Sequence, residues 1–170
     1  MTRRAVLMMA CAATVDVVLP IWLHPVPRLI WNASASVPIG LYAVQPEGAL
    51  HLDSLAVVSP PEPLASFLAD RGYLPKGVPL LKHIAALPGQ TVCRIDRKIT
   101  VDGKALGEAF LRDRRGRTLP VWHGCSAVQP GAVFLMNPQV EDSLDGRYFG
   151  VLPAAAIAGQ AEPLWTEKEH

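Results

Sequence analysis

The sequence has almost no net charge, because 16 lysines and arginines stand against 15 acids in 170 residues, for a formal charge of +1. A balance so close to zero gives no electrostatic basis for binding nucleic acid. The one basic cluster, Arg112 to Arg117, is short and contains an acid, which predicts a solvated loop. Internal repeats and low-complexity tracts are also lacking, so the length fits one domain with its own core.

Cysteine is scarce, with three in the chain. Cys11 lies in an apolar N-terminal run, which leaves Cys93 and Cys125 as the possible pair in the rest. A metal site built from these two with His123 would lack a convincing ligand set, so we expect neither a metal nor a cofactor. An oxidising compartment would permit a disulfide between Cys93 and Cys125, and the sequence leaves open whether it forms.

An apolar run does occupy the N-terminus, at residues 5–23. Its length is close to the roughly 20 residues that span a bilayer, and Arg3 and Arg4 before it favour a cytoplasmic N-terminus. Asp16 weakens this interpretation, since an acid near mid-membrane costs about 2–3 kcal/mol. A cleaved signal peptide is the alternative, because "MACAA" offers small residues at a suitable spacing. Either way the run is an export signal, and an uncleaved anchor is favoured.

We therefore expect two regions, an N-terminal anchor or signal segment at 1–28 and an exported domain at 29–170. Prolines and glycines are spread along the chain, which suits short strands and turns. A short helical pattern follows the prolines near residue 60 and ends before Gly72. The domain should be mainly β and antiparallel, with Asp102-Gly103 as a hairpin turn. The predicted strands are 41–45, 54–59, 78–87, 91–95, 98–106, 125–137, 146–153 and 156–165.

A lysine interrupts the apolar stretch "VPLLKHIAALPG", residues 78–89. Successive residues of a strand face opposite sides, so Lys82 and His83 cannot both point into the core. One interpretation is an edge strand whose lysine reaches solvent. The other is a buried lysine whose pKa falls below its ordinary value of about 10.4, so that the neutral amine can accept a proton from a serine hydroxyl.

Two serines, Ser34 and Ser36, lie in the stretch "NASASVPIGLY", residues 32–42. Taken alone, its proline and glycine predict a polar turn before a strand, in which the hydroxyls satisfy turn backbone. If a neutral lysine lies nearby, one of these hydroxyls could instead be a nucleophile.

A third polar stretch, "EDSLDGRYFG" at 141–150, places Ser143, Asp145 and Arg147 at alternate positions. On extended backbone these three side chains would share a face. A polar turn before a strand is one interpretation. The other is a supporting role, in which Ser143 holds the lysine amine and an Asp145–Arg147 ion pair fixes the loop.

Together these segments resemble the signal peptidase I family of membrane-bound serine-lysine proteases, and within it the conjugative-transfer branch of TraF-type peptidases. The resemblance covers nearly the whole chain and rests on "SASVPIGLY", "LADRGYLPKGVPLLKHIAALPGQ", "DSLDGRYFG" and "AIAGQAEPLW". It implies a mainly β fold, with a signal-peptidase-like antiparallel β domain preceded by one N-terminal transmembrane or signal helix.

The resemblance also implies roles for individual residues. Ser36 matches the nucleophile and Lys82 the general base. Ser34 lies where the family can place an oxyanion-hole hydroxyl, beside the backbone N–H of Ser36. A competing Ser-His-Asp mechanism is disfavoured, because the histidines sit in no recognisable pattern with a serine; they include His51, His83 and His123.

In the third segment Ser143 matches the serine that orients the lysine. Asp145 matches an acidic residue important for activity in the transfer branch, and Arg147 matches its partner. Two features depart from the family. The usual Asp-Ser-Arg reads Asp145-Gly146-Arg147, and the Gly-Asn-rich stretch before it is replaced by "MNPQVED".

The implied function is that of a membrane-associated serine endopeptidase that processes exported precursor proteins. In the transfer branch the precursor is a pilin, and acyl transfer to the substrate's own amine can give a cyclic product. Expected partners are the precursor, the membrane and conjugation or secretion machinery, with the catalytic domain on the periplasmic side of the bacterial inner membrane. A general type I signal peptidase and an inactive β-rich scaffold of a secretion channel remain alternatives.

Overall fold

The structure is a computed structural model that describes residues 3–23, 28–46 and 48–167. The expected boundary at residue 28 follows residues 24–27, which lie outside the described part, as do the side chains of Asp16 and Pro20. The elements, in chain order, are α1 (Arg3–Leu23), β1 (Leu29–Asn32), β2 (Gly40–Gln45), β3 (Leu55–Val58), α2 (Leu64–Asp70), β4 (Leu80–Ala86), β5 (Thr91–Ile95), β6 (Lys98–Val101), β7 (Lys104–Glu108), β8 (Gly124–Ala127), β9 (Ala132–Leu135), α3 (Gly146–Phe149), β10 (Val151–Pro153), the 3₁₀ turn η1 (Ala154–Ala156) and β11 (Ile157–Thr166).

The strands of the described residues form two antiparallel sheets. The larger has seven strands in the order β1-β2-β11-β3-β4-β9-β10, and the smaller has four in the order β7-β6-β5-β8. The expected hairpin turn joins β6 to β7, where Asp102 and Gly103 both have positive φ angles, of 48° and 78°. Positive φ angles at both central residues are typical of the type I′ turn, whose twist matches that of the two strands it joins. The mainly β, antiparallel prediction is therefore confirmed.

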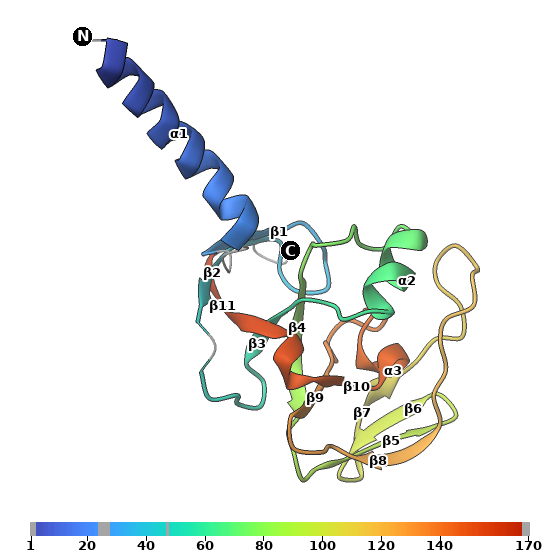
Figure 1. The fold of residues 1–170 in the computed structure, drawn as a ribbon. Helices are drawn as coiled ribbons and strands as arrows, with labels where there is room; N and C mark the ends of the chain where they lie inside the picture. Colours follow the sequence, from blue (N-terminus) through green and yellow to red (C-terminus); the bar gives the residue numbers. More distant parts are fainter. Residues whose placement is uncertain (1–2, 24–27, 47, 168–170) are drawn as a thin grey trace.

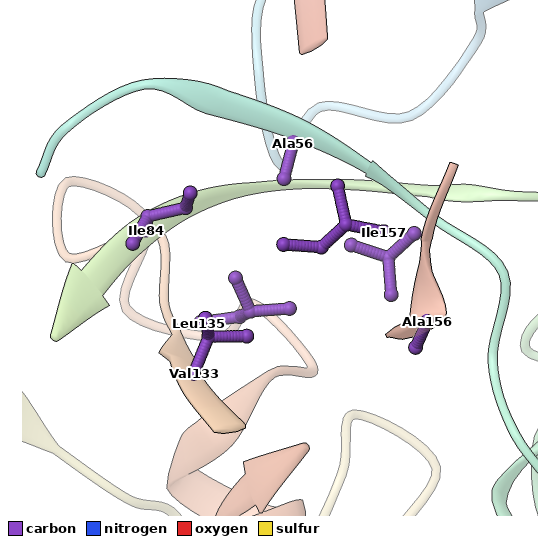
Figure 2. Packing of buried hydrophobic residues seen from close by; sticks show 7 residues of the cluster. Ala56, Ile84, Val133, Leu135, Ala156 and Ile157 are labelled. Carbon is purple, nitrogen blue, oxygen red and sulfur yellow. The ribbon is translucent and has the colours of Figure 1, made fainter. Parts of the chain in front are cut away.

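The core of the larger sheet is aliphatic and lies between strands that are distant in sequence. Figure 2 shows Ala56 of β3, Ile84 of β4, Val133 and Leu135 of β9, and Ile157 of β11 pointing toward one another. Each of these side chains is almost fully buried. Burying one Val, Leu or Ile contributes roughly 1.5–3 kcal/mol, so this cluster fixes β4 firmly against its neighbours.

The smaller sheet is cross-linked internally and held to the rest of the domain by a polar contact. Within the sheet a disulfide connects Cys93 of β5 to Cys125 of β8, which resolves the question that the sequence left open. Arg94 of β5 is fully buried, and its Nη1 donates to the main-chain oxygen of Arg147 in α3, 2.6 Å away. The small sheet is thus held against the segment that contains Ser143 and Asp145.

Two predictions about helical structure have different outcomes. The helix expected before Gly72 is α2, and Gly72 follows it with a φ of +64°, a conformation that glycine adopts without strain. The strand expected at 146–153 is wrong in its first half, because residues 146–149 form the helical turn α3 and only 151–153 pair with β9.

The N-terminal run forms α1, which projects from the domain at the end where β1 and β2 lie (Figure 1). In the part of the chain that the structure describes, no helix combines the length and apolar character needed to cross a membrane.

Candidate active site

The loop between β1 and β2 carries both serines, and Asn32 at the end of β1 closes it. The buried Asn32 amide donates to the carbonyl oxygens of Ser34, Val37 and Pro38 at 2.8, 3.0 and 3.1 Å. Tyr42 of β2 donates its hydroxyl to the Pro38 carbonyl at 2.6 Å. The Asn32 side chain thus satisfies three backbone carbonyl groups of the turn by hydrogen bonding, which gives the loop one defined shape.

The two serine hydroxyls are neighbours in this loop. Ser34 Oγ lies 3.0 Å from Asn32 Oδ1, to which it donates, and 3.2 Å from Ser36 Oγ. Because the Ser34 hydroxyl donates its hydrogen bond to Asn32 Oδ1, the hydrogen bond between the two hydroxyls is donated by Ser36. The Ser36 side chain is only half-buried, so its oxygen is accessible from the adjacent cavity.

Lys82 lies in the middle of β4 and is 4% exposed. Its Nζ donates to Ser143 Oγ at 2.9 Å. Burial lowers the pKa of Lys82 to about 8. The negative charge of nearby Asp145 opposes this shift, and the positive charge of Arg147 adds to it. At pH 7 about a tenth of the molecules then hold a neutral amine, against fewer than one in a thousand for a lysine of ordinary pKa.

Ser36 and Lys82 face one cavity, of about 640 Å³. Ser34 and Ser143 line it as well, so four of the six predicted site residues meet there. Among the described residues, Ser143 is the hydrogen-bond partner of the amine and no direct bond joins Lys82 Nζ to Ser36 Oγ. Such bonds are often long without substrate and shorten when it binds.

Asp145 and Arg147 lie behind the cavity and are each 1% exposed. Asp145 caps α3 by accepting from the Arg147 N–H at 3.1 Å, and it also accepts from the Asn137 N–H at 3.0 Å. The Arg147 Nε lies 3.4 Å from Asp145 Oδ1. The same guanidinium donates to the carbonyl oxygens of Asn137, Val140 and Glu141. The pair therefore fixes the segment that leads to the lysine's partner.

The charge of Asp145 is set by opposing effects. Burial raises the pKa of the Asp145 carboxyl, while Arg147, the Asn137 N–H and Lys82 lower it. A carboxylate here helps to neutralise a guanidinium that is otherwise buried without an acid.

The expectation that Ser143, Asp145 and Arg147 share one face of an extended strand is wrong. Asp145 is extended, but its side chain caps the turn that begins at Gly146, so Arg147 belongs to α3. A Cβ at position 146 would lie 2.6 Å from both the Leu135 carbonyl oxygen and the Phe134 ring. The departure from Asp-Ser-Arg therefore has a steric reason, because β9 packs directly on the backbone there.

Asn137 is a site residue that the sequence reasoning missed. Its Nδ2 donates to the carbonyl oxygen of Ser36 at 2.7 Å and to that of Leu81 at 3.3 Å, and its Oδ1 accepts from the His83 N–H at 3.0 Å. These contacts join the serine loop to the backbone on both sides of Lys82. An asparagine that directly follows the apolar run "AVFLM" is the signal that could have indicated a buried polar role.

The described histidines, His51, His83 and His123, make no hydrogen bond with either serine hydroxyl or with the Lys82 amine. His83 Nδ1 is 3.1 Å from Asn137 Oδ1, on the opposite side of β4 from Lys82, as strand alternation predicts. His51 and His123 are exposed, and in the part of the chain that the structure describes no histidine side chain bonds to a serine. The geometry therefore supports lysine rather than histidine as the proton acceptor.

Comparison with known proteins gives consistent matches. The family model described as signal peptidase, peptidase S26, matches residues 1–165. A conjugal transfer protein TraF from Agrobacterium fabrum is 34% identical over 147 residues, which cover 79% of this chain and 81% of that protein. A plasmid transfer protein TraF from Escherichia coli is 28% identical over 145 residues, with the same coverage. A crystal structure of a signal peptidase I from Enterococcus faecalis V583 matches at 19% identity with a TM-score of 0.39, covering 68% of this chain and 98% of that one.

Proposed function

Because the chain belongs to the signal peptidase family, peptidase S26, we propose that it is a serine endopeptidase in which Ser36 is the nucleophile and Lys82 the general base. One observation supports this most directly. A lysine of strongly lowered pKa is buried on the wall of the cavity into which the Ser36 hydroxyl opens. A neutral amine beside a serine is the arrangement that serine-lysine catalysis needs. An inert scaffold would gain nothing from burying a lysine without a carboxylate in direct contact.

In the proposed reaction, Lys82 takes the proton of Ser36 as Oγ attacks the scissile carbonyl carbon. The Ser36 backbone N–H stabilises the negative oxygen that forms, together with the Ser34 hydroxyl once that hydroxyl rotates from Asn32 Oδ1 toward the substrate. Losing one such donor costs about 2.7–4 kcal/mol in other proteases. The protonated Lys82 then gives its proton to the leaving amine. Water, or a second amine of the substrate, attacks the acyl-enzyme ester and restores the Ser36 hydroxyl.

The remaining predicted residues act by holding this pair in place. Ser143 fixes the rotamer of the lysine amine through its hydrogen bond. Asp145 and Arg147 fix the segment before Ser143. These are positioning roles, because none of the three has to contact the substrate.

For the substrate we propose an exported precursor, in particular the pilin precursor of a conjugative transfer system. The support is the similarity to relatives named as conjugal or plasmid transfer proteins. Either hydrolysis or cyclisation by the substrate's own amine would complete the same acyl-enzyme, and the geometry of Ser36 and Lys82 serves both.

We further propose that residues 1–28 anchor or export the chain and that the domain works at the periplasmic face of the inner membrane. An exposed pair, Trp31 of β1 and Trp165 of β11, supports this, with ring centroids 5.9 Å apart. Leu29 and Leu164 beside them are also more than half exposed. These strands lie at the end of the domain from which α1 departs (Figure 1), and tryptophan is enriched at membrane interfaces.

The test is mass spectrometry of a pilin precursor incubated with the wild type, Ser36→Ala or Lys82→Ala. The wild type should yield a shortened or cyclic product, and both variants should leave the precursor intact while keeping the wild-type circular dichroism spectrum. Substantial processing by Ser36→Ala would refute the assignment of the nucleophile.

A further inference from the structure

The connection between β7 and β8 forms one wall of the catalytic cavity. Residues 110–119, here the basic loop, contain four arginines and one acid, at positions 112–117. The sequence suggested a solvated loop, and the structure adds that Arg112, Asp113, Arg114, Arg115 and Arg117 line the same cavity as Ser36 and Lys82. The basic residues therefore share a cavity with the proposed reacting groups.

The basic loop has a defined shape because it is built around Asp113. The Asp113 carboxylate accepts from the backbone N–H groups of Arg115 and Arg117, both at 2.9 Å, and from the Arg117 Nε at 2.7 Å. A hydrogen bond from the Tyr73 hydroxyl, together with these, lowers the pKa of Asp113. Arg117 also donates to the Arg71 carbonyl at 2.7 Å. The loop is thereby attached to the end of α2.

Two of the four arginines are neutralised within the protein. Arg117 pairs with Asp113, and Arg114 pairs with Asp142, the residue before Ser143. The other two have no carboxylate partner among the described residues. Arg112 donates to the Gly116 carbonyl, a neutral acceptor, and Arg115 contributes only its backbone N–H. The cavity wall therefore carries about two uncompensated positive charges.

Other walls of the cavity are apolar and would hold the non-polar part of an extended peptide. They are formed by Leu68, Leu74, Leu80, Leu119, Val140 and Leu144. An occupant that satisfies both surfaces is a peptide with apolar residues and an acidic side chain near the bond to be cut. Resting on the proposed function, we propose that Arg112 and Arg115 select precursor segments with aspartate or glutamate close to the scissile bond.

An anionic lipid surface is the other partner that free arginines could attract. The position of the basic loop favours the peptide, because Figure 1 shows this connection, in yellow to orange, on the side of the domain away from α1. The exposed tryptophan pair lies at the α1 end instead. A membrane at that end would leave the basic loop facing the incoming substrate.

The test uses synthetic peptides that share an Ala-x-Ala cleavage site, the type that signal peptidases accept, and carry glutamate, glutamine or lysine at two positions on either side. The enzymes are the wild type, Arg112→Gln/Arg115→Gln and a matched control, Lys98→Gln/Lys104→Gln, which removes the same charge from β6 and β7. The readout is the ratio of kcat/KM for the glutamate and glutamine peptides.

We expect the wild type to favour the glutamate peptide by about 1.4- to fivefold for each arginine engaged, since exposed pairs contribute roughly 0.2–1 kcal/mol each. The preference should fall toward one in the arginine double variant, persist in the control and weaken at high salt. An Arg115→Glu variant should shift the preference toward the lysine peptide.

Four outcomes would overturn the proposal in distinguishable ways. Equal cleavage of glutamate and glutamine peptides by the wild type would refute selection by the basic loop and leave the proposed function standing. Loss of the preference in the lysine control as well would have the same meaning. Reduced binding of the arginine variant to phosphatidylglycerol vesicles with unchanged peptide preference assigns the loop to the membrane. Cleavage that survives Ser36→Ala refutes the proposed function itself.

Discussion

Replacing Asn137 by alanine should misplace the nucleophile without unfolding the domain. The change removes the donor to the Ser36 and Leu81 carbonyls and the acceptor for the His83 N–H. A buried polar group without its partner costs about 1–3 kcal/mol, and the Ser36 carbonyl beside the cavity can bond to water instead. The loss should therefore be about 2–4 kcal/mol, within the 5–15 kcal/mol that domains of this size hold.

The effect on catalysis should exceed what lost stability explains. Asn137 is the side chain that ties the serine loop to both neighbours of Lys82. A displacement of about 1 Å between reacting groups can cost roughly a hundredfold in rate. We expect kcat to fall by about 10- to 100-fold, with KM changed little and the midpoint of the pH profile kept, because the burial of Lys82 is untouched.

The control is Ile99→Ala, a fully buried position of the small sheet whose truncation costs a similar 2–5 kcal/mol. Both variants should melt earlier than the wild type, and only Asn137→Ala should lose kcat in a steady-state peptide assay below the melting range. A wild-type kcat for Asn137→Ala would show that the amide only stabilises the fold and would refute the argument.

Cleavage should rise with pH and level off above a midpoint near 8, because the neutral form of Lys82 is the base and becomes populated only above its lowered pKa; a midpoint near 10.4 would contradict the role of burial. Ser143→Ala should lower kcat and move that midpoint to lower pH, because the charged Lys82 amine loses a hydrogen-bond acceptor that stabilises it. The pH–rate profile is measured beside that of the wild type, and an unmoved midpoint would contradict this role. Cys93→Ser/Cys125→Ser should lower the free energy of unfolding by about 3–4 kcal/mol, as expected for a bond across a separation of 32 residues, and urea melts that coincide with those of the wild type would refute this.

Local patterns were sufficient to predict most of the strands, and short motifs that resemble a known family indicated the catalytic candidates. The apolar stretch around Lys82 predicted β4, because strand alternation and hydrophobic flanks are properties of neighbouring residues. It left open whether the amine reaches solvent or is buried, and the structure shows it buried. The hairpin at Asp102-Gly103 followed from turn chemistry in the same way. The spacing of the serines was enough to bring Ser34 and Ser36 together, because both lie in one short loop.

What the sequence could not predict depends on contacts between distant segments. Asp145 starts α3 because its carboxylate is also held by Asn137, and alternation alone suggested a strand there. The bridging role of Asn137 requires β9 to lie beside β4, a pairing that no local pattern indicates. The basic loop is largely exposed, as its charges predict, but its place in the cavity wall depends on its attachment to Arg71, a contact between distant segments.

The position of β11 has a consequence for when this protein becomes active. The strand that follows the serine loop, β2, pairs with β1 on one side and with β11, at the C-terminal end of the described chain, on the other. Gln45 is thus paired with Gln160, and most of the polypeptide lies between them. Pairings this far apart form slowly, because the entropy of closing the long intervening loop is lost before the contacts compensate for it. A chain still emerging from the ribosome or from an export channel would hold its serine loop without this support. Competence to cut would then depend on β11 having joined β2, which couples activity to completion of the larger sheet.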